Sequence, residues 1–115
     1  MILNWITPDD KNDHYHFQNV DLSHSHFNDM EGVYIIWQGN GPIVRVGQGI
    51  VKNRIASHRN DREVTAYGNL YVTWAKVPAV YRDGVERYLA NRLNPRVGDA
   101  FPDVDPIAVN LPWAI

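Results

Sequence analysis

A predicted β-hairpin constrains the fold of this chain more than any other part of its sequence. Residues 32–38 are mainly β-branched or aromatic, and residues 43–47 are again rich in β-branched side chains. The Gly-Asn-Gly-Pro segment between these two runs is typical of a tight turn. The sequence therefore predicts an antiparallel pair of strands as the clearest element of the fold.

After the hairpin, the apolar spacing predicts a helix, a strand and a second helix in that order. Apolar residues recur at helical spacing in residues 50–60, and residues 70–77 are almost continuously apolar, as in a well-covered strand. The second helix is expected from about Ala79 to Leu93, and Pro95 ends it. The expected fold class is α/β (α+β), with a small, mostly antiparallel three-stranded sheet flanked by helices.

The length of 115 residues is typical of a single domain. We expect residues 1–31 to form an irregular arm with room for one short strand, and residues 32–96 to form the core. Residues 97–115 are expected to form an extended tail packed on that core, because three prolines and an alternating apolar pattern follow the second helix.

Several classes of protein are excluded or disfavoured by composition. The chain has no cysteine, which excludes a disulfide framework, a thiolate zinc site and a cysteine nucleophile. The longest apolar run, residues 33–37, is too short to cross a bilayer, so no membrane association is expected. The first residues lack the pattern of an export signal, and a cytoplasmic location is the expectation.

Charge is distributed unevenly along the chain. Residues 1–44 contain one basic and six acidic residues (−5), whereas residues 45–96 contain ten basic and four acidic residues (+6), and the overall net charge is −2. A basic middle segment of this kind favours a face that binds phosphates, with Lys52, Arg59 and Arg62 as candidate nucleic-acid contacts. The alternative is an ordinary solvated surface on which the charges have segregated by chance.

Hairpin geometry places Tyr34 and Arg45 near each other. If the turn centres on residues 39–40, the two side chains lie directly opposite, and if the pairing slips by two they become diagonal neighbours. In either register they project from the same face of the sheet.

The two predicted helices add further polar side chains to this region. Arg54 and His58 are four residues apart, so they lie on one face of the first helix at the margin of its apolar stripe. Glu86 is offset from the apolar stripe of the second helix. We therefore expect a tyrosine, two arginines and a histidine to converge in this region.

In this order and spacing the chain resembles the GIY-YIG nuclease domain family. The resemblance covers about residues 32–96 and includes the order of elements. The residues that carry it are Gly32-Val33-Tyr34, Arg45-Val46-Gly47, Arg54, His58 and Glu86, with Gly32 and Gly47 as the motif glycines.

The resemblance implies a metal-dependent endonuclease that hydrolyses phosphodiester bonds in nucleic acid, DNA above all. Glu86 would bind one Mg²⁺ or Mn²⁺ ion, which needs few protein ligands because it keeps several waters. Arg54 would stabilise charge on the phosphoryl oxygens, and Tyr34 would take a proton from the attacking water. His58 would assist Tyr34 or bind phosphate.

The chain departs from the family pattern in two places. Arg45 replaces the tyrosine of the second motif, which either abolishes water activation or adds a cation that favours the phenolate and contacts phosphate. The asparagine expected after the last helix is missing, and Asn94 and Asn110 are the candidate substitutes. These departures leave open a second hypothesis, a catalytically impaired domain that binds nucleic acid or a protein partner. A separate protein partner that directs the domain to its substrate is a further alternative.

Two His-x-His-Phe motifs raise a third hypothesis. Residues 14–17 and 24–27 carry them ten residues apart, and on strands such alternation points both imidazoles of a motif to one side. Four histidines could then hold a transition metal such as zinc or nickel. The alternative is a polar arm in which histidine recurs by chance.

Overall fold

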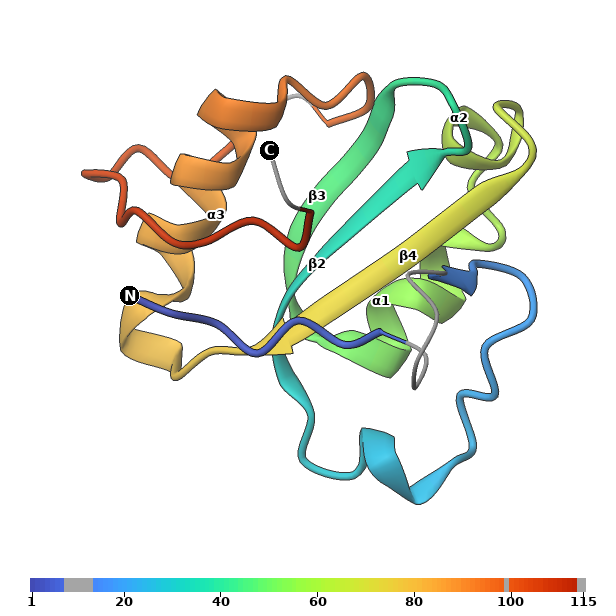
Figure 1. Cartoon of the computed structure of the whole chain (residues 1–115), viewed down its shortest axis with the longest axis horizontal. Coiled ribbons are helices and arrows are strands. Elements are labelled where there is room, and N and C mark those ends of the chain that lie inside the picture. Colours follow the sequence, from blue (N-terminus) through green and yellow to red (C-terminus); the bar gives the residue numbers. More distant parts are fainter. Residues whose placement is uncertain (8–13, 99, 114–115) are drawn as a thin grey trace.

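The computed structural model describes residues 1–7, 14–98 and 100–113, and it contains a four-stranded antiparallel sheet. Across the sheet the strands lie in the order β1-β4-β2-β3 (Figure 1). The α+β class is confirmed, but the expectation of three strands is wrong because a two-residue strand from the arm pairs with β4. The strands are β1 (Tyr15–His16), β2 (Glu31–Gln38), β3 (Ile43–Ile50) and β4 (Leu70–Lys76).

Four helical segments accompany this sheet, and none of those described is long and apolar enough to cross a membrane. They are the 3₁₀ helix η1 (Ser25–Phe27), α1 (Val51–His58), α2 (Arg62–Thr65) and α3 (Ala79–Leu93). The helix α3 begins and ends at the residues that the apolar spacing predicts. Asn94 ends this helix in the left-handed conformation, with φ of 51°, and a proline follows it.

The hairpin adopts the slipped register. Tyr34 pairs with Gly47 and Ile36 pairs with Arg45, so Tyr34 and Arg45 are diagonal neighbours on one face. Towards the turn, Val44 has no partner on β2. This β-bulge shifts the register of the last paired residues. Beyond the predicted end at residue 47, β3 continues for three residues to Ile50.

Two hydrophobic clusters cover the two faces of the sheet. Because side chains alternate along a strand, β2 contributes to both clusters and is buried on both faces. In Figure 1, α1 lies behind the strands, whereas α3, the first residues and the C-terminal tail lie on the other face. The cluster on the α1 face includes Tyr34, Ile36, Val51, Ile55 and Trp74. The cluster on the α3 face includes Val33, Ile35, Val46, Val85 and Leu89.

The two ends of the described chain are tied to the body of the protein. Asn110 holds the first residues, because its side-chain Oδ1 accepts from Leu3 N at 2.6 Å and its Nδ2 donates to Leu3 O at 3.0 Å. The tail packs on α3 at Gly84, where a Cβ atom would lie 2.5 Å from Ile107. Glycine within this helix therefore makes room for the tail.

Candidate active site

Tyr34 and His58 form a buried pair on the α1 face of the sheet. The Tyr34 hydroxyl lies 2.6 Å from His58 Nε2. Tyr34 has no exposed surface, and His58 is 5% exposed. Strand β2 positions the phenol, and the last turn of α1 positions the imidazole above it.

Gly47 on β3 makes this pair possible. A Cβ atom at residue 47 would overlap the Tyr34 hydroxyl and ring. The second motif glycine is therefore required by the space that the phenol occupies, since its φ is not in the left-handed region.

We expect Gly47→Ala to destabilise the protein by about 1 to 3 kcal/mol and to break the Tyr34–His58 hydrogen bond, because the new methyl group displaces the phenol. Urea unfolding measures the stability, and the NMR signals of the His58 ring report the hydrogen bond. Gly41→Ala in the same hairpin is the matched control, because its Cβ would meet the movable side chain of Gln38. Equal effects of the two substitutions would contradict the close approach of Gly47 to the Tyr34 phenol.

His58 is neutral at neutral pH. Burial and the nearby charges of Arg45 and Arg54 lower its pKa from 6.5 to about 4. In the tautomer that leaves Nε2 unprotonated, the phenol donates its proton to the imidazole. The contact is then a hydrogen bond between two neutral side chains, with the phenol as donor.

This depressed pKa predicts acid sensitivity. In the unfolded chain His58 becomes protonated near pH 6.5, whereas in the folded chain it becomes protonated only near pH 4. The unfolding free energy therefore decreases as the pH falls through this window. Between about pH 7.5 and about pH 4.5, we expect wild type to lose about 2 to 3 kcal/mol more of its unfolding free energy than His58→Gln. Urea unfolding of both proteins at both pH values measures this difference, and the comparison cancels the other titrating groups. Parallel pH profiles would show that His58 is not held neutral.

Glu86 lies at the edge of this region, on the first half of α3. It is 8% exposed, and its Oε1 accepts a hydrogen bond from Gln48 Nε2 at 2.8 Å. The same nitrogen donates to Asp83 Oδ1 at 2.5 Å. Burial raises the pKa of Glu86, and the Gln48 hydrogen bond and the charges of Arg45 and Arg54 partly oppose this rise.

Gln48 connects the hairpin to α3 and was not predicted as a site residue. It belongs to the part of β3 that extends beyond the predicted strand. A signal was present, because alternation places residue 48 on the same face as Val46, towards α3, where a polar side chain needs a partner.

The two arginines link the Tyr34–His58 pair to Glu86 electrostatically. The charges of Arg45 and Arg54 each lower the pKa of His58 and each oppose the rise at Glu86. Within the described parts of the chain, the Nε atom of each arginine is buried without a hydrogen-bond partner. Each arginine therefore keeps a donor that the described chain leaves unsatisfied.

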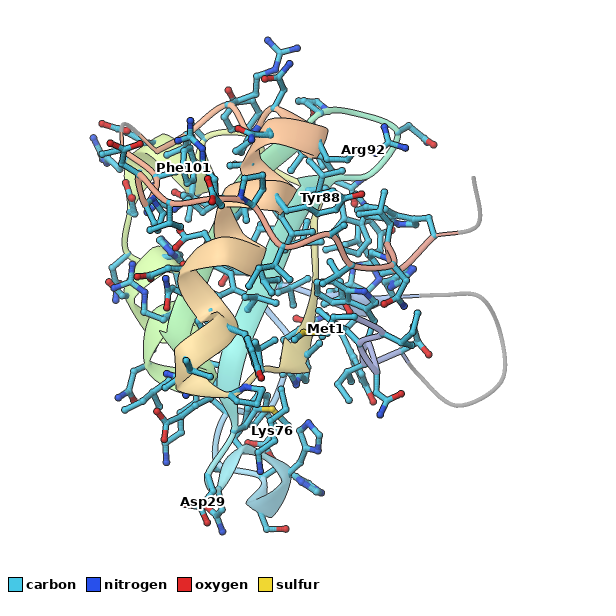
Figure 2. All side chains as sticks on the ribbon, turned by 90° about the vertical axis from the view of Figure 1, so that its left-hand side faces the viewer. Met1, Asp29, Lys76, Tyr88, Arg92 and Phe101 are labelled. Atoms are coloured by element: carbon cyan, nitrogen blue, oxygen red, sulfur yellow. The ribbon has the colours of Figure 1, made fainter. Side chains whose placement is uncertain are left out.

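Gly98 makes room for Arg45 in the segment after α3. A Cβ atom there would lie 2.6 Å from Arg45 Nη1, and φ of +119° independently favours glycine. Figure 2 views the protein from the α3 side and shows Tyr88 and Arg92 on this helix, with Phe101 on the segment that follows. Glycine at this position therefore lets the segment after α3 approach the Arg45 side chain.

The other predicted site residues have different environments. Arg59 donates from Nε and Nη2 to Phe17 O and from Nη2 to Val20 O, so these donors hold the arm rather than a phosphate. Lys52 is half-buried in α1, and Arg62 is exposed on α2.

Three more residues singled out in the sequence serve the architecture. A Cβ atom at Gly32 would overlap the carbonyl of Ala75, so this motif glycine allows β2 to approach β4. Of the two candidate asparagines, Asn94 ends α3 and Asn110 holds the first residues.

The four histidines of the paired motifs make separate contacts. His14 packs edge-on against Trp37, and His16 packs against Tyr71 with 36° between the ring planes. His24 Nδ1 accepts from His26 N, and His26 Nε2 accepts from Trp74 Nε1. In residues 1–7, 14–98 and 100–113, no three histidine or acidic side chains are grouped as metal ligands.

Comparisons of the chain with protein-family models, with curated proteins and with solved structures found no match. The function is therefore inferred from the residues of the site.

Proposed function

We propose that this protein is a metal-dependent endonuclease that hydrolyses phosphodiester bonds in nucleic acid, with DNA as the preferred substrate. The observation that carries the proposal is the position of Arg45 and Arg54, whose charges reach both the Tyr34–His58 pair and Glu86. The resemblance to the GIY-YIG family adds support, because it assigns the same side chains to one reaction.

The arginines bind the scissile phosphate in this proposal. A guanidinium stays protonated and presents several donors, so it suits an anion whose charge grows in the transition state. The buried, unpaired Nε atoms of Arg45 and Arg54 show that neither side chain has satisfied all its donors within the described chain. Arg45 then serves as a second phosphate contact where the family has a tyrosine.

The Tyr34–His58 pair receives the proton of the attacking water. As the water oxygen bonds to phosphorus, its proton passes to the Tyr34 oxygen and the phenol proton passes to His58 Nε2. The bond from phosphorus to the leaving oxygen breaks, and that oxygen takes a proton from solvent. Burial and the charges of Arg45 and Arg54 hold the pKa of His58 low, and a bound phosphate opposes the contribution of the two arginines.

Glu86 and Asp83 suit a hard divalent cation. Their carboxylates share one amide donor from Gln48, so two oxygen ligands lie close together near the surface of α3. A Mg²⁺ or Mn²⁺ ion held by these carboxylates would supply Lewis-acid polarisation of the phosphate and stabilisation of the leaving oxygen. Glu86 is the principal ligand, since Asp83 is exposed.

A domain that binds nucleic acid without cutting it is the second candidate, and one observation favours it. Tyr34 has no exposed surface, so a water reaches its hydroxyl only if neighbouring side chains move when substrate binds. The endonuclease proposal includes that movement. The binding-only alternative does not need it.

Cleavage of labelled duplex DNA, branched DNA and RNA under single-turnover conditions tests the proposal. We expect cleavage with Mg²⁺ or Mn²⁺ and none with EDTA, and DNA should be cut faster than RNA. Binding of these substrates without cleavage under either metal would favour the second candidate. Cleavage that persists in EDTA would contradict the assigned mechanism.

A further inference from the structure

A hollow of about 420 Å³ lies on the α1 face of the sheet, beside the arm. Its size is within the range of small-ligand sites in proteins. We call it the aromatic pocket. The lining residues used below are Tyr15, Asn19, Asp21, His24, His26 and Trp74.

Flat rings form much of this pocket. Trp74 is only 2% exposed and lies beneath Tyr15, which is 38% exposed and stacks on it at 5.8 Å between ring centroids and 25° between ring planes. Phe27, which also lines the pocket, lies 5.1 Å from Trp74. The indole Nε1 donates to His26 Nε2 at 3.0 Å, which fixes the indole in place. Aromatic surfaces of this kind are the stacking platforms that bind single bases.

The rim of the aromatic pocket carries hydrogen-bonding groups of both kinds. His24 Nδ1 accepts from His26 N, so a neutral His24 carries its proton on Nε2 and can donate from it. Asp21 supplies carboxylate oxygens, and Asn19 supplies both an amide donor and an acceptor. Such a set suits the edge of a nucleobase, which presents donors and acceptors in one plane.

The aromatic pocket adjoins the candidate active site. Trp74 is the direct pairing partner of Tyr34 across β4 and β2, on the same face. The buried Trp74 side chain separates the pocket from Tyr34, and Arg45 lies two strands away from Trp74, on β3. Arg59 at the end of α1 holds the backbone of Val20, which lines the pocket.

We propose that the aromatic pocket binds an unpaired base of the nucleic-acid substrate. This inference rests on the proposed function and adds to it a preference for substrates with unpaired bases. A base that enters the pocket and stacks on the exposed ring of Tyr15 is not paired with another base. The protein therefore selects single-stranded, bulged or branched substrates over regular duplex.

Equilibrium binding of two labelled single strands, measured by fluorescence anisotropy in EDTA, tests this proposal. One strand is a thymidine oligonucleotide, and the other has the same length and abasic residues throughout. We expect wild type to bind the thymidine strand at least about 5-fold more tightly, the effect of stacking one base. Tyr15→Ala should reduce this preference to nearly equal binding. His16→Ala should keep it, because His16 is the next residue of β1, is also exposed and lies outside the pocket.

The outcomes separate the pocket from the proposed function. Equal binding of the two strands by wild type, weakened on both by Arg54→Ala, would overturn the base pocket and leave the phosphate site intact. Equal losses of preference in Tyr15→Ala and His16→Ala would show that the base binds elsewhere. If wild type bound neither strand, the nucleic-acid function would fail together with the pocket.

Discussion

Glu86→Gln is expected to lower metal-dependent cleavage by about a thousand-fold, because a bound metal contributes several kcal/mol of transition-state stabilisation. An amide keeps the shape of the side chain but supplies no anionic ligand. Single-turnover cleavage with Mg²⁺ measures the loss.

The same substitution should leave the protein at least as stable as wild type at neutral pH. Burial raises the pKa of Glu86, so the folded state favours the neutral carboxyl and loses stability as the pH rises above 4.5, where the unfolded chain ionises. Glutamine removes this cost. A melting temperature equal to or above that of wild type, together with lost cleavage, is the signature of a carboxylate kept for function at the expense of stability.

Glu31→Gln is the matched control for Glu86→Gln. Glu31 is an exposed carboxylate that pairs with Arg82 at 3.4 Å, outside the site. We expect the Glu31→Gln variant to cleave at the wild-type rate within about 2-fold, since surface ion pairs contribute little to stability. Equal cleavage by both variants would remove Glu86 from the mechanism.

Tyr34→Phe is expected to slow cleavage by about 100-fold to 10,000-fold, the range for losing a general base. It removes one oxygen atom and leaves the ring in the core. Because His58 then loses a buried partner, stability should also fall by about 1 to 3 kcal/mol. Tyr88→Phe is the control, as a partly buried tyrosine on the opposite face of the sheet.

A double-substitution cycle separates proton transfer from simple loss of stability. If Tyr34 and His58 move one proton together, Tyr34→Phe with His58→Gln should cleave no more slowly than the slower single variant. Independent roles would instead multiply the two losses. Cleavage by Tyr34→Phe at the wild-type rate would contradict the role of the phenol.

Most of the central fold can be predicted from local sequence. The hairpin and α3 follow from strong, repeated signals, including the turn residues and Pro95. Elements that rest on few residues are not predictable in this way. β1 has only two residues and depends on pairing with β4, and α2 spans a single turn capped by the Asp61 side chain.

The candidate site is predictable to a similar extent. Spacing alone places Tyr34 and Arg45 on one face and puts Arg54 and His58 together on α1. The register, and with it the role of Gly47, depends on a bulge at Val44 that the turn sequence does not reveal. Arg59 illustrates the limit of charge patterns, since its donors hold backbone carbonyls of the arm, which no sequence pattern places beside α1.

The most direct test of the proposed centre is the number of Mn²⁺ ions bound per protein in the presence of a phosphorothioate oligonucleotide that resists cleavage. Electron paramagnetic resonance counts the bound ions in wild type and in Glu86→Gln under identical conditions. We predict one ion in wild type and a large loss of affinity in Glu86→Gln. Equal binding by the two proteins, or none by wild type, would contradict a single-metal phosphodiesterase site at Glu86.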